Sequence, residues 1–525
     1  MPEDYDRSKT HSVAMYLTRD MREFIDDKVY YANLVEDFRP DGEAVTESWN
    51  AMSNETCNSC HDPLALHGGR RQDVKLCVTC HSPQSLDPDT GNTVDMKVMI
   101  HKIHMGAELP SVQAGIPYQI IGFRNSVHDY SHAVFPQSNL NCTTCHPADS
   151  PEGDIWYTRP TRASCGSCHD NINWVTGEGH RPGPAENDDT CARCHTPEGE
   201  SEFDISIIGA HTQPANSTQL AGFNAEILEL SNTGPGEHPT VTYRLTNDAG
   251  ETIEPGSLPF LNAVLAGPTE DYVTRISERI VEASAQDGDA YSYTFNEVVP
   301  NDAEGESYAV ALEGFRMVPI DVREDEPLIF RETSNNPVEY FKAGGGEPDL
   351  RRMSVTDASC NNCHKDLNFH GTIRQGIEYC VTCHNPTADD SPVRPDEALP
   401  ARSIDFKFLI HRIHRGQDLD RPYTVYGFGS RPHTYNSVVY PGDLRNCEAC
   451  HESGSYGLPT PGVEPTFDAN EFFSPMLTGS TVCLSCHDTQ SAAAHAFVNT
   501  APFGESCASC HGENREFSVT KVHAR

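Results

Sequence analysis

The chain has 525 residues, enough for three or four domains. It carries 38 Lys and Arg against 77 Asp and Glu, and the net charge of −39 excludes a nucleic-acid binder, which needs clustered basic residues. Mean hydropathy is −0.53 and no apolar run is long enough for a membrane-spanning helix. Only 37% of residues are hydrophobic, so we expect something besides aliphatic packing to hold the chain together.

The first fifty residues resemble the end of a β-domain. THSVAMYLTRDM at 10–21 matches SYAVALEGFRMV at 307–318 weakly, and each segment precedes a cysteine-rich region. We therefore predict a partial β-domain over 1–50. No secretory leader is visible at the start, so we expect a mature, processed or partial chain.

The cysteines identify a cofactor. All 20 fall in ten C-x-x-C-H runs, the attachment signature of c-type haem. Two thiols three positions apart bond to one porphyrin, and the adjacent histidine ligates the iron. Disulfides and structural zinc are the alternatives, but neither needs a histidine after every second cysteine.

We therefore predict ten haem c groups. Their thioether bonds come from Cys57, Cys60, Cys77, Cys80, Cys142, Cys145, Cys165, Cys168, Cys191, Cys194, Cys360, Cys363, Cys380, Cys383, Cys447, Cys450, Cys483, Cys486, Cys507 and Cys510. The proximal iron ligands are His61, His81, His146, His169, His195, His364, His384, His451, His487 and His511.

The motifs form an internal repeat. CNSCHDPLALHGG (57–69) and CVTCHSP (77–83) recur as CNNCHKDLNFHG (360–371) and CVTCHNP (380–386). Each pair is followed by a helix-like run, MKVMIHKIHMG (96–106) or FKFLIHRIHRG (406–416). We predict two loop-rich pentahaem modules with short helices, over 51–199 and 351–525, in which the porphyrins supply buried apolar mass.

The remaining histidines supply the second axial ligands. Because the repeat matches five pairs for five haems per module, bis-histidine ligation is the economical interpretation. The distal candidates are His67, His101, His104, His128 and His180 in the first module and His370, His411, His414, His433 and His495 in the second. His211 and His523 align loosely and are weaker candidates, as is His132, which has Ser437 opposite it.

The stretch between the modules has a different pattern. Residues 200–350 contain no cysteine, and AEILELSN (225–232), TVTYRLTN (240–247), AYSYTFNEVV (290–299) and SYAVALEGF (307–315) are typical of strands. We predict an antiparallel β-sandwich or barrel there. It serves either as a docking domain or as a spacer that sets the angle between the modules.

With these features the sequence resembles the outer-surface decahaem cytochromes of metal-reducing bacteria, the family of MtrC, OmcA and MtrF. The likeness rests on CNSCHDPLALHGG, MIHKIHMG, LIHRIHRG and the count of ten motifs, and it covers nearly the whole chain. It implies β-domains alternating with pentahaem modules, export to the cell surface, and electron transfer from an outer-membrane conduit or other redox proteins to Fe(III) or Mn(IV) oxides, flavins or electrodes. Unlike many members, this sequence has no cysteine left for a lipid anchor or a disulfide.

Three functions remain open from the residues. The first is an extracellular electron conduit by haem-to-haem hopping, with terminal metal or flavin reduction. The second is a soluble periplasmic or secreted electron shuttle or store without mineral contact. The third, a reductase of a small molecule such as nitrite, needs an open iron site, whereas distal histidines are in surplus here.

Overall fold

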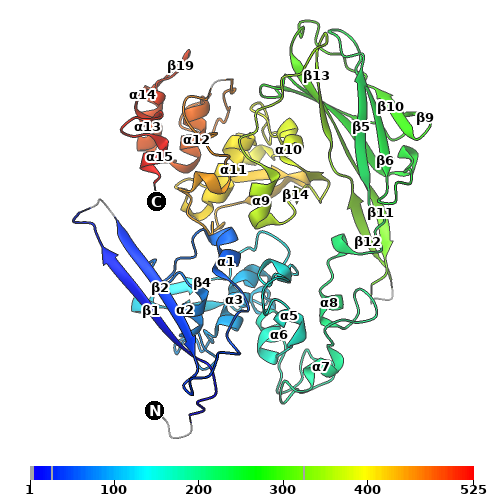
Figure 1. Ribbon diagram of the computed structural model, residues 1–525. Coiled ribbons are helices and arrows are strands. Elements are labelled where there is room, and N and C mark those ends of the chain that lie inside the picture. The colour runs from blue at the N-terminus through cyan, green and yellow to red at the C-terminus, as the bar shows by residue number, and fades with distance from the viewer. Residues whose placement is uncertain (1–4, 25–27, 323–325, 461, 525) are drawn as a thin grey trace. The chain divides into compact units, whose positions relative to one another are not determined.

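The computed structural model describes residues 5–24, 28–322, 326–460 and 462–524 (Figure 1). It comprises two compact units. Unit 1 is Met1–Thr212 with Pro441–Asp443, and unit 2 is Gln213–Tyr440 with Leu444–Arg525. None of the helices in these described ranges is long and apolar enough to cross a membrane.

Unit 1 begins with a two-stranded antiparallel hairpin, β1 (His11–Asp20) and β2 (Val29–Phe38), which Figure 1 shows as a long ribbon. Side chains alternate across β2, so that Tyr31 and Asn33 are half-buried while Tyr30 and Leu34 are exposed. The hairpin is the partial β segment predicted from the sequence.

The rest of unit 1 is built from short elements joined by loops. Its helices are α1 (Asn54–His61), α2 (Val74–Val78), α3 (Met96–Met105), α4 (Pro110–Gln113), α5 (Ile155–Thr158), α6 (Arg162–Cys168), α7 (Cys191–Cys194) and α8 (Ile207–Ala210), and its small hairpin is β3 (Gln119–Ile121) with β4 (Val127–Asp129). Unit 1 therefore reaches Thr212, and α8 lies with the first module although the sequence predicts a β-domain from residue 200.

Unit 2 begins with two antiparallel sheets. One has the order β5 (Asn224–Ser231), β6 (Thr240–Thr246), β10 (Ala290–Thr294), β9 (Ala285–Asp287). The other has the order β12 (Leu328–Thr333), β11 (Ser307–Ile320), β7 (Phe260–Gly267), β8 (Thr274–Arg279), with β13 (Val338–Lys342) also on β11. Alternate residues of β6, namely Val241, Tyr243 and Leu245, are fully buried in a core that both sheets share. The predicted sandwich is confirmed.

The second module follows with the same kind of short elements. They are α9 (Asp357–His364), β14 (Asn368–Phe369), β15 (Arg374–Gln375), α10 (Ile377–Cys383), α11 (Phe406–Arg415), β16 (Thr424–Gly427), β17 (Arg431–Thr434), α12 (Thr478–Cys486), α13 (Gln490–Val498), β18 (Thr500–Ala501), β19 (Gly504–Glu505), α14 (Ala508–His511) and α15 (Val519–Val522). The loop-rich modules with short helices agree with the predicted fold class.

Candidate functional site

One helical turn holds each C-x-x-C-H motif. In the second motif the backbone N–H of His81 donates to the carbonyl of Cys77 at 2.9 Å, and the fourth repeats this from His169 to Cys165 at 2.9 Å. The turn keeps both thiols and the imidazole close together, as attachment to one porphyrin requires. None of the twenty cysteines of these motifs is in a disulfide, so every pair of thiols is available for a porphyrin.

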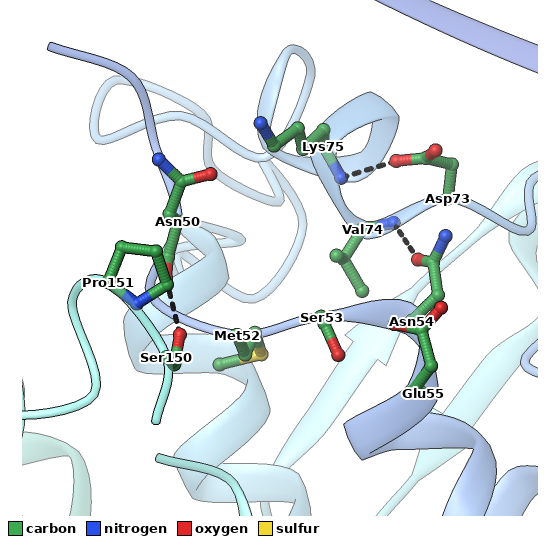
Figure 2. A pocket seen from close by; sticks show the side chains of 10 residues that line it. All are labelled: Asn50, Met52, Ser53, Asn54, Glu55, Asp73, Val74, Lys75, Ser150 and Pro151. Atoms are coloured by element: carbon green, nitrogen blue, oxygen red, sulfur yellow. Dashed lines mark hydrogen bonds between the residues drawn. The ribbon is translucent and has the colours of Figure 1, made fainter. Parts of the chain in front are cut away.

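The first two motif helices of each module are tied together. In unit 1 the Asn54 side chain at the start of α1 accepts from the backbone N–H of Val74 in α2 at 2.8 Å, beside a pocket of about 240 Å³ (Figure 2). In unit 2 Asp357 of α9 accepts from the N–H of Ile377 in α10, also at 2.8 Å. A side chain at one helix start thus satisfies an orphan donor at the next, which fixes the spacing of the two motifs.

Two histidines project from each of the helices predicted at 96–106 and 406–416. The structure has them as α3, with His101 and His104, and α11, with His411 and His414. Both helices end at a glycine with positive φ, 44° at Gly106 and 43° at Gly416. A Cβ at either glycine would lie 2.2 Å from a backbone oxygen, so only glycine fits this chain reversal.

Nine of the ten motif histidines face a second imidazole ring. The centroid separations fall between 6.0 and 6.3 Å: His61–His104 6.1, His67–His81 6.0, His101–His146 6.3, His169–His211 6.3, His364–His414 6.2, His370–His384 6.0, His411–His451 6.0, His487–His523 6.1 and His495–His511 6.2 Å. A metal–nitrogen bond of about 2 Å on each side, plus the distance from nitrogen to ring centre, gives a separation of this size. The residues therefore fit an iron held between two imidazoles.

The ring nitrogens are oriented for this role. The Nδ1–H of His104 donates to the carbonyl of Ile100 at 2.9 Å, and that of His384 donates to Ile404 at 2.8 Å. A carbonyl only accepts, so each ring is the tautomer whose Nε2 keeps its lone pair for a metal. Burial also lowers the pKa of His414 to about 4, which keeps this imidazole neutral at pH 7.

The structure pairs His211 and His523, rather than His128 and His433, with motif histidines. His211 follows α8, and its Nδ1–H donates to Ile207 at 2.7 Å; His523 follows α15, and its Nδ1–H donates to Val519 at 3.0 Å. In the sequence, the feature that could have identified His211 and His523 is that each follows the fifth motif of its module.

His128 and His433 are exposed on the small strands β4 and β17. Among the described residues, neither ring faces a motif histidine. Their Nε2 atoms lie over Gly122 and Gly427, where a Cβ would be 2.7 and 2.6 Å away. His132 is also exposed, near Asp129.

The remaining motif histidine, His195 of the fifth motif, donates from Nδ1 to the carbonyl of Ile205 at 3.1 Å. Its expected partner is His180, which matches His495 in the repeat. His180 donates from Nδ1 to Gly183 at 2.7 Å and lies edge-on against Trp174. Both rings thus have the same tautomer as His104 and His384.

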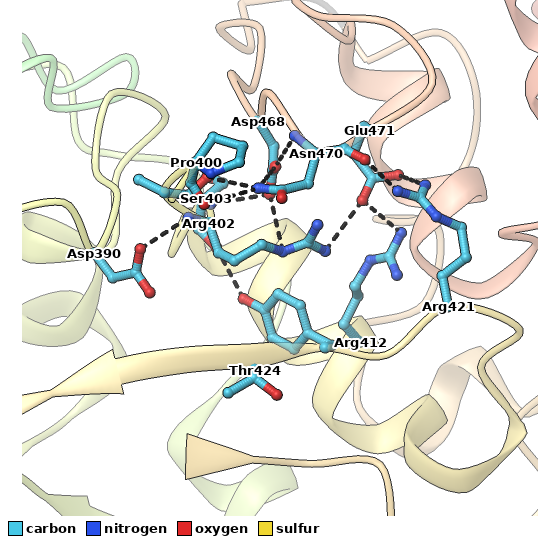
Figure 3. Close-up of polar contacts among 12 residues, drawn as sticks. Asp390, Pro400, Arg402, Ser403, Arg412, Arg421, Thr424, Asp468, Asn470 and Glu471 are labelled. Carbon is cyan, nitrogen blue, oxygen red and sulfur yellow. Dashed lines mark hydrogen bonds and ion pairs between the residues drawn. The ribbon is translucent and has the colours of Figure 1, made fainter. Parts of the chain in front are cut away.

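A buried ion network anchors α11 in the second module (Figure 3). Glu471 accepts from Arg402 at 3.1 Å, from Arg412 at 3.0 Å and from Arg421 at 2.8 Å. Arg412, which follows His411, is fully buried and also lies 3.5 Å from Asp488, next to the motif residue His487. In the first module Lys102 makes the corresponding contact with Asp170 at 2.5 Å.

Comparisons with known proteins identify the family of the chain. Residues 50–206 and 352–524 match the family model described as outer membrane cytochrome MtrC/MtrF-like, domains II/IV. The multihaem cytochrome MtrC of Shewanella baltica (strain OS185) is 21% identical over 553 residues, covering 91% of this chain and 72% of that protein.

Solved structures share the fold. The crystal structure of MtrC from Shewanella baltica OS185 aligns with a TM-score of 0.63 at 17% identity, over 97% of this chain and 82% of that one. The outer membrane decahaem cytochrome OmcA aligns with a TM-score of 0.68 at 20% identity, over 99% of this chain and 80% of that one. With its ten C-x-x-C-H motifs and this family match over both modules, the chain belongs to the MtrC/MtrF-like outer membrane cytochromes and is an electron-transport protein with ten c-type haems.

Proposed function

We propose that this chain carries electrons by haem-to-haem hopping to acceptors outside the cell, namely Fe(III) or Mn(IV) oxides, flavins or electrodes. The observation that carries the proposal is the set of nine facing imidazole pairs, to which we add His180 with His195 as the tenth. An iron with two imidazole ligands is coordinatively closed, so it supplies one-electron transfer rather than substrate binding.

The distal ligands in this proposal are His67, His101, His104, His180 and His211 in the first module and His370, His411, His414, His495 and His523 in the second. Backbone carbonyls orient many of these rings and raise their basicity, which favours the ferric state. His128, His132 and His433 have no axial role in this scheme.

The family description and the resemblance of the repeat favour a place at the outer membrane, where the chain receives electrons from an outer-membrane conduit or other redox proteins. The net charge of −39 adds a negative field that lowers haem potentials and repels anionic partners at low salt. Low potentials suit a donor to external metal oxides.

The test uses intact cells that produce the full chain. Proteinase added outside should degrade the protein and abolish electron delivery to an iron oxide, while a periplasmic marker protein stays intact. Survival of the chain together with unchanged oxide reduction would refute the surface conduit and favour the periplasmic shuttle.

A further inference from the structure

In both modules, a β segment holds the loop that carries one distal histidine. In unit 2 the loop is His370–Gln375, and the sandwich binds it at several points. Arg331 of β12 donates to the carbonyl of Gly371 at 3.0 Å, and Asn336 accepts from the backbone N–H of Gln375 at 2.8 Å. The loop is therefore attached to the sandwich on both sides of its turn.

A buried ion pair completes the attachment in unit 2. Glu313 lies on β11 and is fully buried, and Arg374 of the loop donates to it at 2.8 Å. Arg374 is half-buried, so this charge-assisted hydrogen bond is shielded from water and holds the loop strongly. An unpaired carboxylate at this depth would be costly, so the loop and the strand need each other.

Unit 1 repeats the arrangement with the N-terminal hairpin in place of the sandwich. Asn33 of β2 accepts from the backbone N–H of Gln72 at 2.8 Å and donates to the carbonyl of Arg70 at 2.9 Å. Arg71 lies over the ring of Tyr16 of β1, 4.3 Å from its centre. The loop held here carries His67.

The two attachments match at four residue positions. Asn33 and Asn336, His67 and His370, Arg71 and Arg374, and Gln72 and Gln375 are separated by the same distance along the chain. The match between 10–21 and 307–318 also places Tyr16 opposite Glu313, so that a cation–π contact stands where the other module has an ion pair. A shared geometry in two sequences that differ this much indicates a common role.

The backbone at each distal histidine needs such support. His67 has φ of 51° and His370 has φ of 57°, and each is followed by a glycine that also has positive φ. Left-handed backbone is unfavourable for a residue with a Cβ and persists where surrounding contacts determine it. The rings of His67 and His370 each lie 6.0 Å from a motif histidine, so the unfavourable backbone sets the ring position.

We propose that Asn33 with Arg71 and Asn336 with Arg374 are positioning residues, which keep His67 and His370 in place as distal ligands of the haems attached at Cys77 and Cys380. The β segments are thus neither passive spacers nor docking surfaces alone, because each fixes one axial ligand. The inference rests on the ligand pairs of the proposed function.

The test measures open iron sites in the full ten-haem protein. The variants are Asn336→Ala and Asn33→Ala, with His370→Ala and His67→Ala as references for a lost ligand. The matched control is Asn296→Ala, whose side chain donates to Glu278 and Tyr293 of the sandwich. The readouts are carbon monoxide bound per reduced chain and the high-spin signal of the oxidised protein in electron paramagnetic resonance.

Each histidine variant should bind one additional carbon monoxide per chain. Each asparagine-to-alanine variant should bind a fraction of one, several-fold above wild type. Asn336→Asp should fall between Asn336→Ala and wild type, because it keeps the oxygen that accepts from Gln375 but loses the N–H that donates to the carbonyl of Leu312. Asn296→Ala should match wild type.

The outcomes separate the two proposals. If His370→Ala and His67→Ala open a site while Asn336→Ala, Asn33→Ala and the double variant Asn336→Ala with Glu313→Gln do not, the positioning role is overturned and the ligand pairs stand. If the histidine variants open no site, the ligand pairs themselves are wrong. Equal opening by Asn296→Ala would show general loosening of the sandwich and would also overturn the positioning role.

Discussion

At the scale of single residues, the proposed axial ligands differ from other histidines in where both of their ring nitrogens lie. His211 and His128 show the difference, since both are histidines of the first module near C-x-x-C-H motifs. His211 has its Nδ1–H bound to a carbonyl and its ring 6.3 Å from that of His169. His128 is exposed, and its Nε2 lies 3.0 Å from the Ser126 hydroxyl.

This contrast leads to a prediction about spin state. His211→Ala should convert one haem, that attached at Cys165, from low to high spin, because its iron loses one of two imidazoles. His128→Ala should leave all ten haems low-spin. Electron paramagnetic resonance of the oxidised proteins measures both, and the pair His523→Ala and His433→Ala repeats the comparison in the second module. A high-spin haem in His128→Ala alone would reverse the assignment.

A second prediction concerns pH. Burial lowers the pKa values of His370, His414 and His451 to about 4 from a reference value of 6.5. Between these values the unfolded chain binds protons that the folded protein does not, so the free energy of unfolding should fall as pH falls from 6.5 toward 4 and should be level just above 6.5. Denaturant midpoints followed by haem absorbance measure this. A midpoint that stays constant between 6.5 and 4 would contradict it.

At the scale of elements, the ligand helices are held by ions as well as by apolar contacts. The network around Glu471 joins α11 to the loop at 468–471 (Figure 3), and Arg412 of α11 also lies 3.5 Å from Asp488, just after the end of α12. Phe408 and Leu409 of α11 pack in the same module core as Met476 and Leu484. Since α11 carries two proposed ligands, its position sets two irons at once.

We predict that Arg412→Leu destabilises the second module by about 1–3 kcal/mol, because two buried carboxylates, Glu471 and Asp488, each lose one of their partners. Lys102→Met should cost less in the first module, since only one carboxylate, Asp170, loses a partner there and Ser111 still donates to it twice. Thermal or denaturant unfolding gives both values. Arg415→Leu is the control on the same helix, because its pair with Asp418 is largely exposed and should contribute less than about 1 kcal/mol. An equal effect of Arg412→Leu and Arg415→Leu would contradict the role of burial.

The strands of the sandwich differ in how clearly the sequence predicts them. Strand β6 alternates buried and half-buried residues, and its predicted limits, 240–247, are close to Thr240–Thr246. Strand β7 has a continuous buried run from Ala263 to Gly267 that sequence analysis did not assign, because an apolar run without alternation is ambiguous. In the structure this strand pairs antiparallel with β11, from Ala266 opposite Ala309 to Phe260 opposite Phe315.

At the scale of the whole molecule, the surplus of carboxylates over basic residues dominates encounters with soluble partners. The net charge of −39 produces a field that reaches about one Debye length, roughly 8 Å at physiological salt. An anionic acceptor is repelled at low salt, and a cationic one is attracted.

We therefore predict that the second-order rate of electron transfer to an anionic soluble acceptor rises with ionic strength, and that the rate to a cationic acceptor of similar potential falls. Stopped-flow measurement on the fully reduced protein gives both slopes. A neutral acceptor is the control and should show little change. Identical salt dependence for the two charged acceptors would exclude steering by the overall charge.

The sequence by itself determined the features that neighbouring residues encode. The ten C-x-x-C-H runs identify the cofactor and its number, and they predict its thioether bonds and one ligand of each iron, because two thiols and an imidazole act on one porphyrin within a single helical turn. The repeat likewise located the two modules and the helices of His101 and His411. Only the tertiary structure brought His211, rather than His128, next to a motif histidine and linked Asn336 to the loop of His370, because those contacts join segments far apart in the chain, and their geometry depends on packing that no local pattern records.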